Sequence, residues 1–138
     1  MTVRAATAND MNAVLEHAQA LATTFEVDPK AFADIFTHHL NNPASAIFVA
    51  EQDSEIVGYC LGHDRPVFFA NGITSWLEEI FVLKSNRQYG LGRQLMDAFE
   101  AWARSRNSKM IALATRRAPL FYEAIGFEDS ATYFRKLL

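Results

Sequence analysis

The chain has 138 residues, a formal net charge of −3, 50% hydrophobic residues and 21% charged residues. This composition is that of a globular protein and excludes a disordered one; the length suffices for a single domain over residues 1–138. The mild acidity gives no electrostatic footprint for nucleic acid. No apolar run approaches the ~18 residues of a membrane span, and the first residues lack the pattern of a secretory signal. We therefore expect a cytoplasmic protein without nucleic-acid or membrane partners.

The N-terminal part of the chain predicts one strand and two helices. Residues 2–6 have strand character, and Thr7 with Asp10 resembles a capping box that begins a helix. Asp28 followed by Pro29 is typical of an N-cap and a first helical residue. Apolar residues then recur at helical spacing and predict one buried stripe on each helix. They are Met11, Val14, Leu15, Ala18, Leu21 and Ala22 on the first helix, and Phe32, Ile35, Phe36 and Leu40 on the second.

The middle of the chain has the two-residue period of strands. Residues 46–51 and 55–63 predict a hairpin that turns at Asp53 and Ser54. The pair Asn71-Gly72 predicts a second hairpin turn.

The pattern continues into a strand over residues 73–83. The segment before that second turn contains Pro66, Phe68 and Phe69, and one interpretation is a loop that lies over the sheet.

The last third of the chain predicts alternating helices and strands. After a helix over residues 91–102 we expect a buried strand at 110–114, a short helix at 118–125 that Gly126 ends, and a closing strand at 131–138. The order β-α-α-β-β-β-α-β-α-β indicates an α/β (α+β) fold, a mixed sheet with helices on its faces.

Two glycines stand one residue apart where the strand ending near residue 83 gives way to a helix, in the sequence RQYGLG of residues 87–92. The first N–H groups of a helix are unpaired and its dipole is positive there, so this end binds anions. Gly90 and Gly92 leave room for a diphosphate, and Arg87 and Arg93 can add charge-assisted contacts. The alternative is a plain strand-to-helix turn.

The spacing excludes two other phosphate motifs. A dinucleotide fingerprint needs a third glycine where this chain has Leu95. A P-loop needs Gly-Lys-Ser/Thr, and Arg93 and Gln94 follow Gly92 instead.

The motif Arg-x-x-Gly-x-Gly after a strand that ends in Val resembles the GNAT (GCN5-related N-acetyltransferase) family. The sequence LFYEAIGF of residues 120–127 is similar to the C-terminal block of that family, and the order of the expected elements also fits. The resemblance covers nearly the whole chain. It implies the GNAT fold, with a mixed, mostly antiparallel central sheet of about six to seven strands and four flanking helices.

The resemblance also implies acetyl-CoA as cosubstrate and assigns residues to bind it. Its pyrophosphate is expected at the phosphate turn, and its pantetheine arm is expected to pair with the backbone of Phe81 and Val82 where the fourth and fifth strands separate. The turn residues are Arg87, Gln88, Tyr89, Gly90, Leu91, Gly92 and Arg93. Two positions depart from the pattern: Lys84 replaces a frequent Pro, and Thr115 replaces a frequent Asn, which puts one side-chain contact to the cofactor in doubt.

Three residues are candidates for acid–base chemistry. Acetyl transfer to an amine needs a base, because alkyl amines are mostly protonated at pH 7. Glu78 and Glu79 lie on an otherwise apolar strand, where a carboxylate is costly without a partner. Strand alternation would place Glu78 with Trp76, Ile80 and Val82, and Glu79 with Leu77 and Phe81 on the other face. The resemblance favours Glu78 as a base that acts through water, with Glu79 as the next candidate. It also implies that Tyr122 protonates the thiolate of CoA. The structural alternatives are solvated carboxylates at the two glutamates and a core role for the tyrosine.

The candidates for the acceptor site and for other chemistry are weaker. In this fold the acceptor would lie near His38, His39, Phe69 and Trp76, although core or dimer contacts are the favoured role for the aromatic residues. The histidines and Cys60 have no metal-ligand spacing, so no metal is expected. Cys60 has no signature of an activated nucleophile, which favours direct attack by the amine.

We therefore expect an acetyl-CoA-dependent N-acetyltransferase that acts on a primary amine of a small molecule or peptide. The acceptors left open are polyamines, amino acids, aminoglycoside-like amines, and protein N-termini or lysines. A homodimer is compatible with the sequence. The alternatives are a non-catalytic acyl-CoA-binding or regulatory protein of the same fold and an unrelated nucleotide-binding domain.

Overall fold

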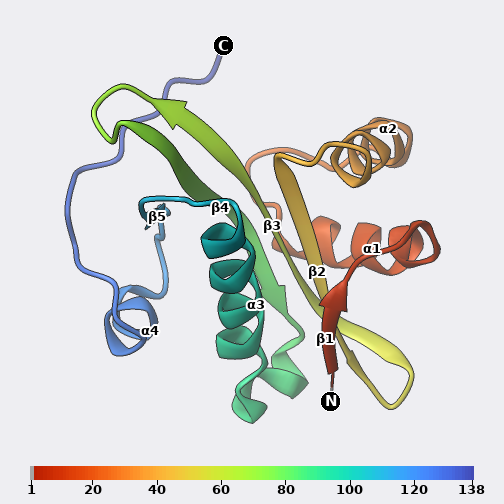
Figure 1. The fold of residues 1–138 in the computed structure, drawn as a ribbon. Helices are drawn as coiled ribbons and strands as arrows, with labels where there is room; N and C mark the ends of the chain where they lie inside the picture. The colour runs from red at the N-terminus through yellow and green to blue at the C-terminus, as the bar shows by residue number, and fades with distance from the viewer. Residues whose placement is uncertain (1) are drawn as a thin grey trace.

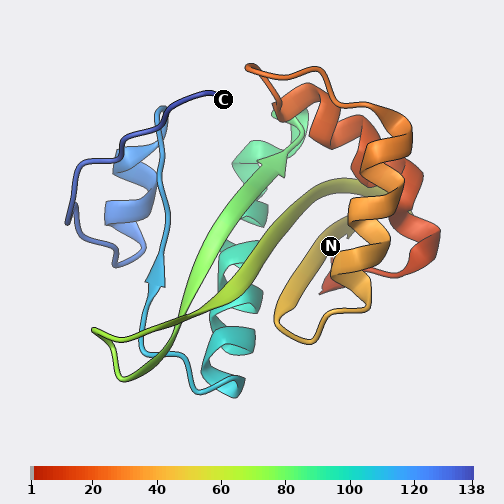
Figure 2. The same cartoon turned by 90° about the horizontal axis from the view of Figure 1, so that it is seen from above.

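A computed structural model describes residues 2–138 and shows one sheet of five strands in the order β1-β2-β3-β4-β5 (Figure 1). The strands are antiparallel except β4 and β5, which are parallel. Helices α1 and α2 cover one face and α3 covers the other, while α4 lies beyond β5 (Figures 1 and 2). The α-helices and strands are β1 (Thr2–Ala5), α1 (Met11–Leu21), α2 (Pro29–Leu40), β2 (Ser45–Gln52), β3 (Glu55–Val67), β4 (Gly72–Val82), α3 (Leu91–Ser105), β5 (Ile111–Ala112) and α4 (Pro119–Ala124). The expected mixed, mostly antiparallel sheet with four flanking α-helices is confirmed.

The first two helices begin at the expected caps. The Thr7 backbone N–H donates to Asp10 Oδ2 at 2.8 Å, within a short 3-10 turn (Ala8–Asp10) that precedes α1. Asp28 Oδ2 accepts from the Ala31 N–H at 2.8 Å, and Pro29 is the first residue of α2.

Burial follows most of the predicted stripes, with two differences. Ile35 is 54% exposed, because Phe36 rather than Ile35 faces the sheet. His17 is buried on α1, where its Nε2 lies 2.7 Å from the Ile56 carbonyl oxygen. This hydrogen-bond partner explains how the polar side chain of His17 can be buried beside the apolar residues of α1.

Two hairpins connect β2, β3 and β4. Asp53 and Ser54 both have positive φ, 52° and 64°, as a two-residue turn of the primed type requires. The second turn spans residues 68–71, because Val67 pairs with Gly72. The aromatic segment is therefore not a loop over the sheet. Phe68 and Phe69 are 102% and 73% exposed at the tip of this hairpin.

Helix α3 packs very closely on the sheet at Gly62. A Cβ atom at this position would lie 2.2 Å from the Phe99 ring and 2.8 Å from the Trp76 carbonyl oxygen. Phe99 is fully buried in a core that α3 shares with β3 and β4. Glycine is thus required at residue 62 for the close approach of a ring to the backbone.

The expected closing strand at residues 131–138 is wrong, so the sheet has five strands instead of six to seven. Residues 127–138 have no regular structure, and every residue from 128 onward is exposed. Alternating apolar residues form a strand only when an open strand edge is available for pairing. The edge of β5 is only two residues long. The segment instead crosses toward the α1–α2 connection, where Arg135 Nη1 donates to Thr24 Oγ1 at 3.1 Å.

Candidate active site

The sheet separates between β4 and β5. The two strands pair only at Ser75 with Ile111 and at Trp76 with Ala112, and β4 continues to Val82 paired with β3 but without β5 beside it. A gap between parallel strands exposes backbone groups that a ligand can bind in the manner of an added strand.

A buried polar network fixes the closed end of this gap. Arg106 Nε donates to Asp64 Oδ2 at 2.7 Å, and Ser75 Oγ donates to Ser108 Oγ at 2.9 Å and lies 3.4 Å from Asp64 Oδ1. Only 3% of the Asp64 side chain is exposed. These contacts join β3, β4, the end of α3 and the residues that precede β5, so they determine where β5 leaves the sheet.

Glu78 occupies a β-bulge in β4. On β3, Leu61 pairs with Glu79 and Gly62 pairs with Leu77, which leaves Glu78 as the extra residue. The expected alternation is wrong at this point: Leu77 packs in the α3-side core with Ile80, and Glu79 lies on the opposite face. Glu79 bonds to Tyr59, which packs with α1 and α2, and Glu78 lies near enough to His39 of α2 to act on its pKa, so both glutamates lie toward this face.

The two glutamates have different surroundings. The Tyr59 hydroxyl donates to Glu79 Oε1 at 2.6 Å, and Tyr59 is 2% exposed. Glu79 therefore satisfies a buried hydroxyl. Glu78 is exposed, and its Oε2 accepts a hydrogen bond from Trp76 Nε1.

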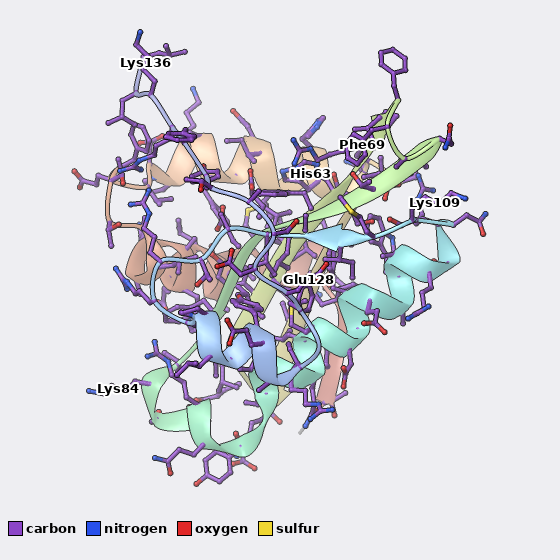
Figure 3. All side chains as sticks on the ribbon, turned by 90° about the vertical axis from the view of Figure 1, so that its left-hand side faces the viewer. His63, Phe69, Lys84, Lys109, Glu128 and Lys136 are labelled. Atoms are coloured by element: carbon purple, nitrogen blue, oxygen red, sulfur yellow. The ribbon has the colours of Figure 1, made fainter. Side chains whose placement is uncertain are left out.

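A cavity of about 1200 Å³ lies between β4, β5, α4 and the C-terminal segment. Figure 3 views this face, with α4 and the segment that carries Glu128 in front of the sheet. Trp76, Glu78, Thr115 and Tyr122 line the cavity, so the structure brings these four predicted residues together. Thr115 Oγ1 accepts from the Ala118 N–H at 3.1 Å and so orders the turn before α4.

Tyr122 points from α4 into the core and is 8% exposed. Its ring meets Phe121 and Phe127 edge-on, with centroids 5.1 and 5.8 Å apart. Burial raises the pKa of Tyr122 above its ordinary value, so the hydroxyl remains protonated at neutral pH. Its chemistry at that pH is that of a proton donor.

The glycine turn forms the N-terminus of α3. It follows a 3-10 helix (Lys84–Tyr89), and Gly90 has a left-handed φ of 74°. A Cβ atom at Gly90 would meet nothing within 4 Å, so the space in front of the turn is open. The first backbone bond of the helix runs from the Gln94 N–H to the Gly90 carbonyl oxygen at 3.1 Å. The preceding N–H groups of the helix have no intrahelical acceptor and are available to an anion.

The side chains around this turn are arranged unevenly. Arg87 donates from Nε to the Val82 carbonyl oxygen at 2.9 Å and lies over the Phe81 ring at 5.9 Å. Gln88, Tyr89 and Arg93 are exposed, whereas the Leu91 side chain is fully buried. Leu91 can therefore offer a ligand only its backbone.

The backbone of β4 presents Ile80 and Val82, rather than Phe81, to the gap. The Leu83 N–H donates to the Val57 carbonyl oxygen at 2.8 Å, and bonded pairs alternate along an antiparallel ladder. Phe81 therefore points its backbone groups toward Tyr59 on β3. The sequence analysis named Phe81 and not Ile80, because the direction of backbone groups depends on the register with β3.

The structure brings only part of the predicted acceptor set together. His39 Nδ1 lies 2.9 Å from Ser45 Oγ, and the His38 and His39 rings are 5.3 Å apart. Burial lowers the pKa of His39, and His38 and His63 lower it further, while the nearby Glu78 opposes them. Phe69 lies at the far end of the β3–β4 hairpin and does not line the cavity (Figure 3).

The described part of the chain supports neither a cysteine nucleophile nor a metal site. Cys60 is fully buried, and burial raises the pKa of its thiol to about 12. Among residues 2–138, no group of three or more His, Cys, Asp and Glu side chains could hold a metal ion. No helix in the same range has the length and apolar character needed to cross a membrane.

The sequence matches the Acetyltransferase (GNAT) family over residues 11–127, which include β2 to β5, the glycine turn and Tyr122. The chain belongs to the GNAT family. It is 31% identical to the aminoglycoside N(6')-acetyltransferase type 1 of Salmonella typhimurium over 104 residues, 66% of this chain and 69% of that protein.

Two solved structures have the same fold. A putative acetyltransferase from Agrobacterium tumefaciens superposes with a TM-score of 0.87 at 25% identity and covers both chains completely. The aminoglycoside N-acetyltransferase AAC(6')-Iy in complex with CoA gives a TM-score of 0.85 at 22% identity, over 98% of this chain and 93% of that one. Acetyltransferases of the GNAT family use acetyl-CoA. The open glycine turn and the gap between β4 and β5 would suit this donor.

Proposed function

We propose that this GNAT-family protein transfers an acetyl group from acetyl-CoA to a primary amine by direct attack. The observation that carries the proposal is the position of Glu78 and Tyr122 on one cavity, beside the gap between β4 and β5. A base and a proton donor on the same cavity are what acetyl transfer to an amine requires.

Acetyl-CoA would bind through two backbone features. The N–H groups at the start of α3 receive its pyrophosphate, and Gly90 leaves the approach open. The pantetheine arm pairs with the backbone of Ile80 and Val82 in the gap. Because Arg87 already occupies the Val82 carbonyl oxygen, the Val82 N–H and the groups of Ile80 remain for the ligand.

The reaction then needs two proton movements. The amine nitrogen attacks the thioester carbonyl carbon, and its proton passes to Glu78 through water. The tetrahedral intermediate collapses, the C–S bond breaks, and the Tyr122 hydroxyl gives its proton to the departing sulfur. Glu78 releases its proton to solvent and solvent reprotonates Tyr122, and the products are CoA and the acetylated amine.

We further propose a small-molecule amine of the aminoglycoside type as the first acceptor class to test. The argument is the relative that is 31% identical and is named for acetylation of an aminoglycoside. The charge of the cavity wall does not distinguish between acceptor classes, because acidic and basic side chains are nearly balanced on it. The acidic ones are Glu78, Glu100, Glu123, Glu128 and Asp129, and the basic ones are Arg104, Lys109, Arg116 and Arg135.

Calorimetric titration with acetyl-CoA, CoA and ADP tests donor binding. Thiol release measured against a panel of aminoglycosides, polyamines, amino acids and peptides then tests transfer. Binding of acetyl-CoA and CoA with turnover of an amine supports the proposal. Binding without turnover of any amine would indicate an acyl-CoA-binding protein, and tight binding of ADP alone would indicate a nucleotide site.

A further inference from the structure

Trp76 contacts the carboxylate that the proposed mechanism uses as its base. Trp76 and Glu78 are two residues apart on β4, and their side chains are in hydrogen-bond contact. The indole Nε1–H donates to Glu78 Oε2, which leaves Oε1 without a protein donor among residues 2–138.

The bulge explains why Glu78 needs such a partner. As the extra residue of β4, Glu78 has no residue opposite it on β3, and its side chain is exposed. An exposed glutamate without neighbours samples many rotamers, and fixing it costs conformational entropy. A hydrogen bond from a fixed donor selects one of these orientations.

The Trp76 ring is itself fixed. The Arg65 guanidinium, which comes from β3, lies 4.8 Å from the centre of the indole, and His63 is the cross-strand partner of Trp76. Residues of the neighbouring strand β3 thus contact the indole, and the indole in turn donates to Glu78.

We infer that Trp76 is a positioning residue that directs Glu78 Oε1 toward the reacting amine. This inference rests on the proposed function. The N–H of Trp76 fixes Oε2, so the other oxygen is presented to the water or amine that loses a proton. The alternative is that Trp76 is a wall of the acceptor site that touches the substrate directly.

A double-mutant cycle separates the two roles. Trp76→Phe keeps a ring on Arg65 but removes the N–H donor. We expect kcat to fall about 10- to 100-fold, the range that a slightly misplaced reacting group costs, with KM for the amine and the Kd for acetyl-CoA changed by less than about twofold. In a Glu78→Gln protein the same substitution should have no further effect on kcat, because the base through which Trp76 acts is absent.

Trp102→Phe is the matched control. Trp102 also has an arginine over its ring, Arg106 at 5.9 Å, but it lies on α3 outside the cavity lining. Its substitution should leave kcat and KM unchanged. Additive effects of Trp76→Phe and Glu78→Gln, or a rise in KM with kcat unchanged, would overturn the inference in favour of a substrate wall.

A spectroscopic measurement tests the contact even if no amine is turned over. The chain has two tryptophans, so in a Trp102→Phe protein Trp76 is the sole tryptophan and can be excited selectively at the red edge of the absorption band. Glu78→Ala should shift its emission and Glu79→Ala should not. Absence of turnover in the wild type together with this shift would reject the proposed function and keep the contact. An emission spectrum insensitive to Glu78→Ala would reject the contact itself.

Discussion

The Tyr59 hydroxyl and the Glu79 carboxylate form a 2.6 Å hydrogen bond on the face of the sheet that α1 covers. The next residue back, Glu78, lies in a bulge, is exposed and lines the cavity. Two adjacent glutamates therefore have separate roles: half-buried Glu79 accepts from a core tyrosine, and exposed Glu78 lies at the proposed reaction centre. Substitutions at the two positions should affect different properties of the protein.

Glu78→Gln should lower kcat by about 10²- to 10⁴-fold, the usual contribution of a general base. The melting temperature should stay within about 1–2 °C, since the side chain is exposed. Steady-state kinetics and thermal unfolding measure the two quantities. Full activity in this variant would remove Glu78 from the mechanism.

Glu79→Ala should instead lower the free energy of unfolding by about 1–3 kcal/mol, because it leaves the buried Tyr59 hydroxyl without an acceptor. Removing the hydroxyl as well, in Tyr59→Phe/Glu79→Ala, should restore much of this loss. Denaturant titration of both variants provides the comparison. A Glu79→Ala protein of wild-type stability but without turnover would make Glu79 the base.

Helix caps and the glycine turn could be predicted because their causes are local. The Thr7–Asp10 and Asp28–Ala31 bonds need only neighbours in sequence. The bulge at Glu78 could not be predicted, because it exists only relative to Leu61 and Gly62 on β3.

The same reasoning explains the errors of alternation and of the closing strand. A side-chain pattern does not reveal whether a partner edge is long enough, and β5 is too short to order residues 131–138. The bond from Arg87 to the Val82 carbonyl oxygen likewise depends on how the 3-10 helix folds back on β4.

Gly90→Asn should weaken acetyl-CoA binding at least about tenfold. Asparagine tolerates the left-handed φ of 74° better than other residues, so the start of α3 should survive. Its side chain would, however, fill the open space in front of the helix N–H groups, and loss of one charge-assisted contact costs about 1.5–3 kcal/mol. Calorimetry with acetyl-CoA measures the change.

Gly90→Ala is the control for this experiment, because alanine is smaller but more strained at positive φ. Alanine should lower the melting temperature more than asparagine and block binding less. If the two variants lose binding in proportion to their loss of stability, the turn has only a structural role.

Gly62→Ala should destabilise the protein by about 1–3 kcal/mol, the usual cost of overpacking. The new methyl group would lie 2.2 Å from the Phe99 ring, so the ring or the sheet must move. Phe99→Leu in the same chain should recover part of the loss by making room. A Gly62→Ala protein with wild-type stability would show that α3 packs less tightly on the sheet than this distance requires.

Asp10 should make the stability of the protein sensitive to acid. The Arg4 guanidinium, which donates to both Asp10 oxygens at 2.8 and 2.9 Å, lowers the pKa of Asp10 below its ordinary value of 3.8. A carboxyl group with a lowered folded-state pKa stabilises the fold fully above its unfolded pKa and loses that effect as pH falls through the folded-state pKa. The stability that Asp10 contributes should therefore be constant from neutral pH down to about pH 5 and decline below pH 4.

Asp10→Asn removes the titrating group. The unfolding free energy of this variant should be lower than that of the wild type at pH 7 and should approach the wild-type value below pH 3. Chemical unfolding from pH 7 to pH 2.5 checks this, and a difference between the two proteins that does not narrow in acid would show that Asp10 stabilises the fold without its charge.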